Sequence, residues 1–288
     1  MHDKRKNRET ALSGRTDSRK KGAGVAFAVH KEKKASPIGV LLSVLFWLAV
    51  WEIATRALNS SLLLVSPVTV LRRLAQLMGT YAFWQNIGTS LIRIAKGYLL
   101  GAVCGILCGI LSAFFPAART LLSPLLSVVK ATPVTSLVIL ALVWIKSYNL
   151  SIFICFLMVF PILTESVRQG IVDADRELLE VAYVYRLSPG RKIRFIYLPS
   201  IRPHLITALS TSIGFAWKAG IAGEVFARPK LGIGSRLFDS KVYLETADIF
   251  CWTLVIVLLS MVIEKGVLWL LQRSRKKETV PPKEETNV

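Results

Sequence analysis

The sequence predicts an all-α membrane protein with six transmembrane helices. Of its 288 residues, 53% are hydrophobic, and the mean hydropathy is +0.50. The apolar residues come in runs close to the roughly 20 residues that an α-helix needs to cross a bilayer. The basic residues gather between these runs, as they do in multi-span membrane proteins. A soluble domain of ordinary composition does not combine these features.

The apolar runs define the expected domain organisation. The six predicted spans cover residues 38–58, 90–115, 120–145, 150–167, 203–226 and 249–271. Residues 59–89 are expected to form an external segment with one short helix, because Ser66 suits an N-cap and Pro67 suits a first turn. Residues 90–271 are expected to form the core, which includes a long polar loop at 168–202.

Small residues and prolines mark the spans of this core. Four glycines recur every four residues in the second span and therefore share one helix face: Gly97, Gly101, Gly105 and Gly109. This small-xxx-small pattern predicts close helix packing, and a gating hinge is the alternative. Pro133 and Pro161 lie inside the third and fourth spans, where we expect each to kink its helix.

The charge distribution predicts the topology. The formal net charge of +19 is typical of proteins that bind nucleic acid or an anionic surface. The position of the basic residues between apolar runs instead favours a role in membrane orientation, so we expect a lipid bilayer and no nucleic acid as partner. With both termini in the cytoplasm, the inner segments carry 24 Lys and Arg and the outer segments ten. This bias predicts a multi-pass protein of the cell membrane.

The inner segments include both ends of the chain. Residues 1–37 are expected to be a disordered basic tail, which supplies eleven of the 24 inner basic residues, and residues 272–288 a second cytoplasmic tail.

The sequence lacks the marks of an enzyme. No G-x-x-x-x-G-K-[ST] motif is present to hold the phosphates of ATP. His2 and His30 lie in the tail, and His204 at the start of a span is expected to be a capping or interfacial residue. The four cysteines lie in apolar runs and are expected to be inert buried thiols. We therefore expect no catalytic residue, metal site or cofactor in this chain.

The loop 168–202 has an internal pattern that indicates two short helices. Residues 175–187 predict an amphipathic helix with Asp173 or Asp175 as N-cap, and 188–190 read S-P-G, which is typical of a turn. Basic residues then alternate with apolar ones up to Leu198-Pro199. Such a segment is either an interfacial structure on the membrane or a docking surface for a soluble partner, and the pattern leaves both open.

The loop and several other segments carry short motifs of one recurring kind. E-V-A at 180–182, Gly190 and I-x-L-P at 196–199 resemble the EAA loop of ATP-binding-cassette (ABC) importer permeases. Further motifs, at about residues 60 to 270, resemble the branch that serves nitrate, sulfonates and taurine: Ser66-Pro67, Ser90-Leu91-x-Arg93, Pro133, Phe160-Pro161, Trp217-Lys218 and Ala222-Gly223-Glu224. Two positions depart from the pattern. Val181 replaces an alanine, and Arg186 replaces the usual glycine, so we expect Gly190 to supply the turn glycine.

The resemblance implies a fold, partners and a coupling role for the loop. The implied fold is a type I ABC importer permease bundle (MetI-like), which works as a homodimer with an extracytoplasmic solute-binding protein. Separate ABC ATPase subunits would carry ATP and Mg²⁺ and receive the loop as a coupling helix. Glu180 would make charged contacts there, and Ala182 would permit close approach. The implied ATPase-coupling residues are Glu180, Val181, Ala182, Arg186, Gly190 and Pro199.

Two lysines lie within apolar runs, where an unpaired charge costs about 3 kcal/mol or more. Lys130 and Lys218 either pair with acids such as Glu165 or Glu224, or they line a path for an anionic solute. We predict a translocation path that includes Lys130, Lys218 and Glu224. A secondary transporter or channel without ATP is the alternative function, but it predicts inverted repeats, which the sequence does not display. A membrane scaffold is the third hypothesis.

Overall fold

The computed structural model describes residues 37–58 and 64–276, all of which belong to helices or their connections. The chain divides into two units, residues 1–50 and 51–288. Within the first unit, only residues 37–50 are described. They form the first part of α2 (Pro37–Leu58), whose residues 41–58 are apolar and long enough to span a membrane. The predicted tails lie outside the described residues, apart from Pro37 and residues 272–276.

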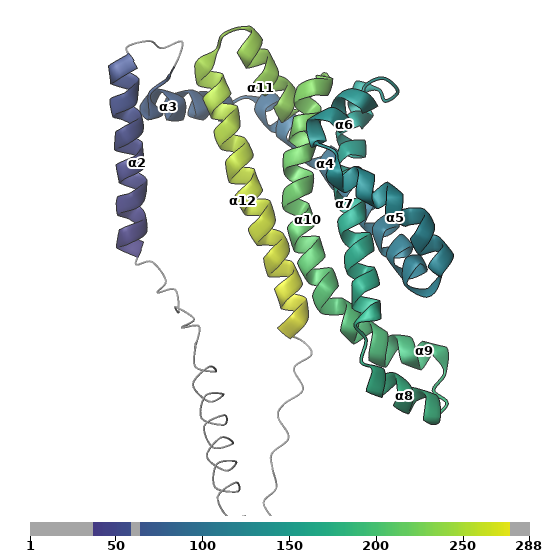
Figure 1. Ribbon diagram of the computed structural model, residues 1–288. Helices are drawn as coiled ribbons and strands as arrows, with labels where there is room; N and C mark the ends of the chain where they lie inside the picture. Colours follow the sequence, from purple (N-terminus) through teal and green to yellow (C-terminus); the bar gives the residue numbers. More distant parts are fainter. Residues whose placement is uncertain (1–36, 59–63, 277–288) are drawn as a thin grey trace, which may run out of the picture. The chain divides into compact units, whose positions relative to one another are not determined.

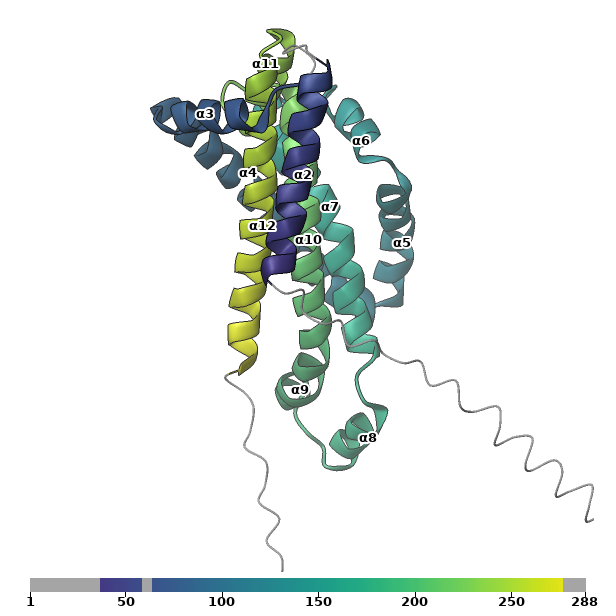
Figure 2. The same cartoon turned by 90° about the vertical axis from the view of Figure 1, so that its left-hand side faces the viewer.

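The second unit is a helical bundle whose core is carried by the long helices α4, α7, α10 and α12, which are drawn in Figure 1. Short helices α3, α6 and α11 lie near one end of this bundle, which we call the α11 end. The helices α8 and α9 lie at the other end, the α8 end (Figures 1 and 2). In chain order the elements are α3 (Pro67–Met78), α4 (Tyr81–Phe114), α5 (Pro116–Ala131), α6 (Val134–Ala141), α7 (Ser147–Val172), α8 (Arg176–Val184), α9 (Pro189–Lys192), the π-helix η1 (Ile193–Tyr197), α10 (Leu198–Ala227), α11 (Ile233–Val242) and α12 (Thr246–Lys276).

Five helical stretches of the described chain are long and apolar enough to be spans, and a sixth is a bent pair. The bent pair corrects the prediction of one kinked span at 120–145. Helices α5 and α6 meet at 106° across Thr132 and Pro133. Thr132 is extended (φ −83°, ψ 130°) because a residue before proline is disfavoured in the α region. Helix α5 thus ends at Ala131 and α6 begins at Val134, so this part of the chain is a broken helix and not a kinked one.

The external segment is shorter than predicted. Helix α3 begins as expected, since the Ser66 hydroxyl accepts a hydrogen bond from the Thr69 amide and Pro67 occupies the first turn. Helix α4, however, begins at Tyr81 after the N-cap Thr80, so residues 81–89 belong to the second span. Its 34 residues make a rod of about 51 Å, longer than the roughly 30 Å hydrocarbon core.

The glycine face of α4 packs against α7, which confirms the prediction of close helix contact. A Cβ atom on Gly101 would lie 2.8 Å from the Val159 Cβ atom, and one on Gly105 would lie 2.9 Å from the Leu163 Cβ atom. Gly97 and Gly109 leave similarly little room. The backbones thus approach more closely than any side chain permits, and this contact positions α7 and α10 at the centre of the core.

Candidate functional site

The polar loop forms a helical hairpin at the α8 end, which we call the α8–α9 hairpin (residues 175–197). Of the two predicted N-caps, the structure selects Asp175, whose carboxylate accepts a hydrogen bond of 2.9 Å from the Glu177 amide. Ala182 is 1% exposed and packs with Ile196 of the hairpin and with the preceding Ala174 in a small apolar cluster. This cluster holds α8 against the following helical segment.

The turn after α8 is a Schellman motif centred on Arg186. The Leu187 amide donates to the Ala182 carbonyl (2.9 Å), and the Arg186 amide donates to the Tyr183 carbonyl (3.1 Å). This pattern requires a left-handed residue directly after the helix end, and Arg186 adopts it with φ +48°. Gly190 lies inside α9 without a positive φ. The prediction that Gly190 replaces the turn glycine is therefore wrong, and Arg186 bears a strain of about 1–2 kcal/mol.

The predicted coupling residues separate into one buried and five exposed positions. Ala182 is buried against Ala174 and Ile196 of its own chain. Glu180 and Val181 are exposed on α8, and the remaining three are exposed elsewhere on the hairpin or the start of α10: Arg186, Gly190 and Pro199. Their contact with an ATPase stays a prediction.

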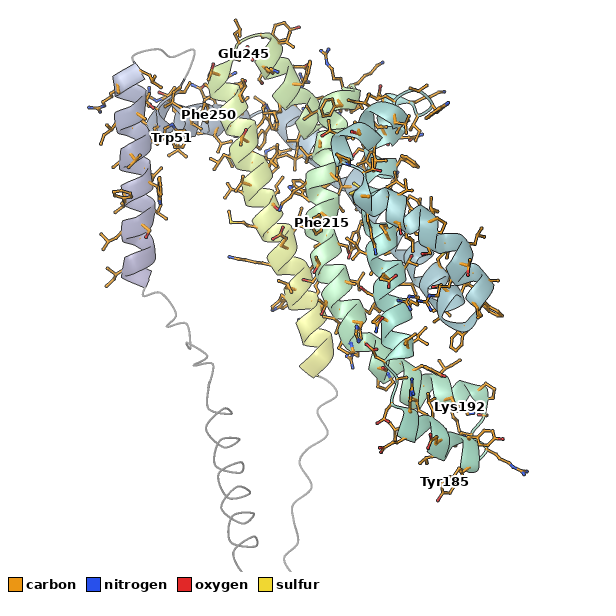
Figure 3. The ribbon with its side chains drawn as sticks, viewed as in Figure 1. Trp51, Tyr185, Lys192, Phe215, Glu245 and Phe250 are labelled. Atoms are coloured by element: carbon orange, nitrogen blue, oxygen red, sulfur yellow. The ribbon has the colours of Figure 1, made fainter. Side chains whose placement is uncertain are left out.

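The free surface of the hairpin is apolar as well as basic. Tyr183, Val184 and Tyr185 are 79%, 75% and 76% exposed, and Tyr185 lies at the far edge of the hairpin (Figure 3). Arg191 and Arg194 are exposed nearby. Because clustered exposed apolar side chains mark interaction surfaces, this tip has the character of a docking site.

The hairpin is joined to the core without a break. Residues 189–227 form one helical stretch of 39 residues, whereas the sequence predicted a span only from 203. Within it, η1 has π geometry, and the Leu198 amide donates to the Ile193 carbonyl. Pro199 and Pro203 follow, and each removes one backbone donor. A displacement of the hairpin would therefore act directly on α10.

Glu224 lies in a buried cluster that joins α4, α10 and the segment before α11. Its carboxylate accepts hydrogen bonds from the Ser90 hydroxyl (2.6 Å) and the Gly234 amide (3.1 Å), and it forms an ion pair with Arg93 (3.2 Å). We call this set the Glu224 cluster: Asn86, Ser90, Arg93, Glu224 and residues 231–234. Its two charged side chains are 3% and 0% exposed.

Backbone groups of the 231–234 segment complete the cluster. The Gly232 amide donates to Asn86 Oδ1 and the Ile233 amide to Ser90 Oγ, both at 2.8 Å. Arg93 also donates to the Leu231 carbonyl and lies 4.5 Å above the ring centre of Tyr148. A Cβ atom at Gly232, where φ is +153°, would lie 2.7 Å from Glu224 Oε2. These hydrogen bonds thus hold the 231–234 segment against α4 and α10.

The cluster changes the expected pairing of the acids. Glu224 pairs with Arg93, and its ion pairs do not include Lys218. The prediction that Glu224 lines a path stays open, and its carboxylate is buried within the Glu224 cluster. The sequence analysis gave Arg93 only as part of the Ser90-Leu91-x-Arg93 motif and as one of the ten outer basic residues, and it missed the pairing with Glu224. The spacing of Asn86, Ser90, Arg93 and Gly97 on one helix face was the signal that could have found it.

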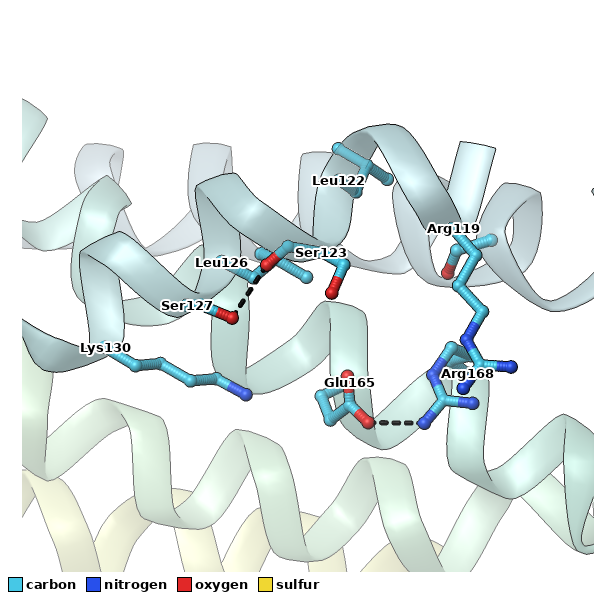
Figure 4. Close-up of a pocket in the computed structure, with 9 residues that line it drawn as sticks. Arg119, Leu122, Ser123, Leu126, Ser127, Lys130, Glu165 and Arg168 are labelled. Carbon is cyan, nitrogen blue, oxygen red and sulfur yellow. Dashed lines mark hydrogen bonds and ion pairs between the residues drawn. The ribbon is translucent and has the colours of Figure 1, made fainter. Parts of the chain in front are cut away.

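The two predicted path lysines are exposed on the surface of the second unit. Lys130 is the penultimate residue of α5 and extends toward Glu165 (Figure 4). Lys218 shares a face of α10 with the exposed residues Thr207 and Thr211. Phe215 belongs to the same face and lies midway along the helix (Figure 3). The side chain of Lys218 has no ion pair or hydrogen bond among the described residues. A lipid-facing charge is expensive, so this face is suited to water or another subunit.

A second ion pair missed in the sequence joins α3 to α12. The Arg73 guanidinium donates to both carboxylate oxygens of Asp248, at 2.6 and 3.0 Å. This bidentate contact raises the pKa of Arg73 and anchors the surface helix α3 at the α11 end of the bundle. The two residues are 175 positions apart, so no local pattern linked them.

Comparison with known proteins places these features in a family context. The family model described as "Binding-protein-dependent transport system inner membrane component" matches residues 101–277. The bicarbonate transport system permease protein CmpB of Synechocystis sp. is 28% identical over 65% of this chain and 67% of its own. The putative aliphatic sulfonates transport permease protein SsuC of Bacillus subtilis is 26% identical over 82% of this chain and 85% of the length of SsuC.

A third relative and one solved structure extend the comparison. The riboflavin transport system permease protein RibX of Chloroflexus aurantiacus is 28% identical over 81% of this chain and 86% of its own. A crystal structure of an amino acid ABC transporter with histidines has a TM-score of 0.56 at 13% identity, over 74% of this chain and 99% of that chain. This last likeness shows a shared fold.

Proposed function

Because this chain belongs to the family of binding-protein-dependent transport system inner membrane components, we propose that it imports a small anionic solute by ATP-driven alternating access. The coarser conclusion is that the chain is the permease subunit of an ABC importer. Nitrate, a sulfonate, taurine or bicarbonate are the candidate solutes. The family membership argues against the ATP-independent carrier and the scaffold.

The observation that carries this proposal is the exposed α8–α9 hairpin at the end of an unbroken helical stretch. Its surface offers Glu180, the exposed side chains of residues 183–185 at the end of α8, and several arginines to a soluble partner. An ATPase subunit that binds this tip and moves it would shift α10 directly. ATP and Mg²⁺ would be held by that partner, and a second copy of the permease would complete the pathway. The partner biases a two-state bundle because it binds the two states unequally.

The anionic character of the solute rests on charge. Lys218 is unpaired among the described residues and lies on a face with Thr207 and Thr211, which suits an aqueous path lined by cationic and hydroxyl groups. Two relatives are named for bicarbonate and sulfonates, whereas a third is named for riboflavin. The relatives alone thus leave the solute class open, and the lysines favour the anion.

The same proposal includes an orientation. Both termini and the α8 end would face the cytoplasm, where ATP is available, and the α11 end would face the solute-binding protein. A reporter placed after residue 288, or inserted beside Leu187, should give a cytoplasmic signal. An external signal at either position would refute this topology.

The function is tested by reconstitution of the permease with its ATPase and solute-binding protein in liposomes. We expect ATP-dependent uptake of labelled bicarbonate, nitrate or methanesulfonate, and no uptake of riboflavin. Glu180→Lys should reduce solute-stimulated ATP hydrolysis, because it reverses a charge on the exposed tip, and Glu177→Lys on the same helix serves as the matched charge control. Uptake that persists without ATP would refute the importer mechanism.

A further inference from the structure

Helix α5 carries a polar face across a region that the sequence predicts to be apolar. Arg119, Ser123, Ser127 and Lys130 follow one another at spacings of four, four and three residues, so they lie on one side of the helix. Figure 4 shows this side turned toward α7, with Lys130 and Arg168 both directed toward Glu165. A pocket of about 150 Å³ lies between these side chains.

The charges around this pocket do not balance. Three cations, Arg119, Lys130 and Arg168, line it together with a single carboxylate, that of Glu165. Arg168 and Glu165 form an ion pair one turn apart on α7. The side chains of Arg119 and Lys130 have no hydrogen bond or ion pair with the described residues and act on the Glu165 carboxylate only at longer range. The empty pocket therefore has a net charge of +2.

The uncharged lining supplies further donors. The Ser123 hydroxyl has no hydrogen-bond partner among the described residues and points into the space between α5 and α7 (Figure 4). The hydroxyls of Ser112 and Ser127 donate to backbone carbonyls of their own helices. Guanidinium, ammonium and hydroxyl donors around a small space are the groups that bind oxyanions, because charge-assisted hydrogen bonds are the strong ones. The pocket has room for a small oxyanion together with water.

We propose that this pocket binds a small oxyanion, of the carboxylate, bicarbonate, nitrate or sulfonate class, and that it is the last binding site the solute occupies during import. This inference rests on the proposed function in that the transported solute is taken to be anionic. Glu165 is the internal counter-ion: it pairs with Arg168 while the pocket is empty and releases this arginine when the anion arrives. The pocket lies toward the α8 end, since Glu165 and Arg168 occupy the last turns of α7 before α8.

The headgroup phosphate of a lipid offers the same chemistry, so the experiment separates the two sources. The full-length chain, purified with its ATPase, is placed in nanodiscs of neutral phosphatidylcholine. Sodium methanesulfonate is titrated against sodium chloride at constant ionic strength while the thermal unfolding midpoint of the permease is followed. We expect methanesulfonate to raise this midpoint in the wild-type protein. No rise in the wild-type protein would overturn the site.

Variants of the pocket should shift the response in opposite directions. Lys130→Met and Arg119→Gln each remove one donor to the anion and should raise the half-maximal concentration about tenfold. Glu165→Gln removes the competing carboxylate and should lower it, an effect that misfolding cannot imitate. Lys265→Met, an exposed lysine of α12, is the matched control and should respond like the wild type. Unchanged half-maximal concentrations in all three pocket variants would overturn the proposal.

Two further arms separate the alternatives. If phosphatidylglycerol in the nanodiscs abolishes the methanesulfonate response of the wild type, and Lys130→Met no longer senses this lipid, the occupant is a headgroup and the solute assignment fails. Uptake in liposomes distinguishes site from function. Normal anion uptake by Lys130→Met and Arg119→Gln would refute the role of the pocket in transport, while the proposed importer function would still hold. Absence of anion uptake by the wild type, with the binding response preserved, would overturn the anionic substrate and leave the binding site.

Discussion

Arg93→Met removes the positive charge from the Glu224 cluster, and we expect it to destabilise the permease strongly. Glu224 is 0% exposed and would keep only the Ser90 hydroxyl and the Gly234 amide as donors. The Leu231 carbonyl would lose its donor as well. Removal of one partner of a buried ion pair costs about 3–5 kcal/mol, because the remaining charge is left without compensation.

The paired substitution tests whether the charge is the cause. Glu224→Gln alone should cost a similar amount, since it leaves the Arg93 guanidinium buried with the Leu231 carbonyl and the Tyr148 ring as its neighbours. In the double variant no buried charge remains, so its cost should be smaller than the sum of the two single costs by about 1–3 kcal/mol. Arg56→Met is the control, because the Arg56–Glu52 pair is exposed (79% and 32%) and such pairs contribute less than about 1 kcal/mol.

The assay is thermal unfolding of the four variants and the wild type in one detergent. For a chain of this size, about 3–5 kcal/mol corresponds to a fall of roughly 6–20 °C in the unfolding midpoint. Limited proteolysis of the 231–234 segment should increase in the single variants, since the Glu224 cluster holds this segment in place. If the costs of the two single substitutions are additive in the double variant, or if the unfolding midpoint falls no further than in Arg56→Met, the argument that the charges of the cluster hold this segment is refuted.

Three other predictions concern the hairpin, the helix contact and the path. Arg186→Gly should stabilise the hairpin by up to about 1 kcal/mol, because glycine adopts the left-handed turn without strain. Hydrogen exchange of the hairpin amides measures this gain. Gly190→Ala is the control and should not relieve the strain. Gly105→Ala should cost about 1–3 kcal/mol in thermal unfolding because its Cβ atom would lie 2.9 Å from a backbone oxygen of α7, whereas Gly88→Ala, with open space around it, should not destabilise the helix. Lys218→Met should assemble normally and lose anion uptake; full uptake by the assembled variant would remove this lysine from the path.

Local physical chemistry determined what could be predicted from the sequence of this protein. Run length located five span-length helices correctly, because the bilayer imposes about 20 residues on every helix that crosses it. The Ser66 N-cap and the Pro67 first turn were predicted correctly because capping involves only neighbours in the chain. The glycine face of α4 was also predicted correctly, since a spacing of four residues specifies a helix face whatever the partner is. The hairpin was recognised from its motif, but the position of its strained turn was not.

Tertiary structure decided the features that depend on distant partners. Glu224 pairs with Arg93, 131 positions away in the sequence, and the hydrophobic pattern contains no information on which of several charges will meet inside a bundle. The same holds for Arg73 and Asp248, and for the approach of Lys130 to Glu165 across two helices. The angle of 106° at Pro133 also required the structure, because a proline removes one helix hydrogen bond without deciding the outcome. Helix α7 continues through Pro161, whereas α5 and α6 are separate helices on the two sides of Pro133.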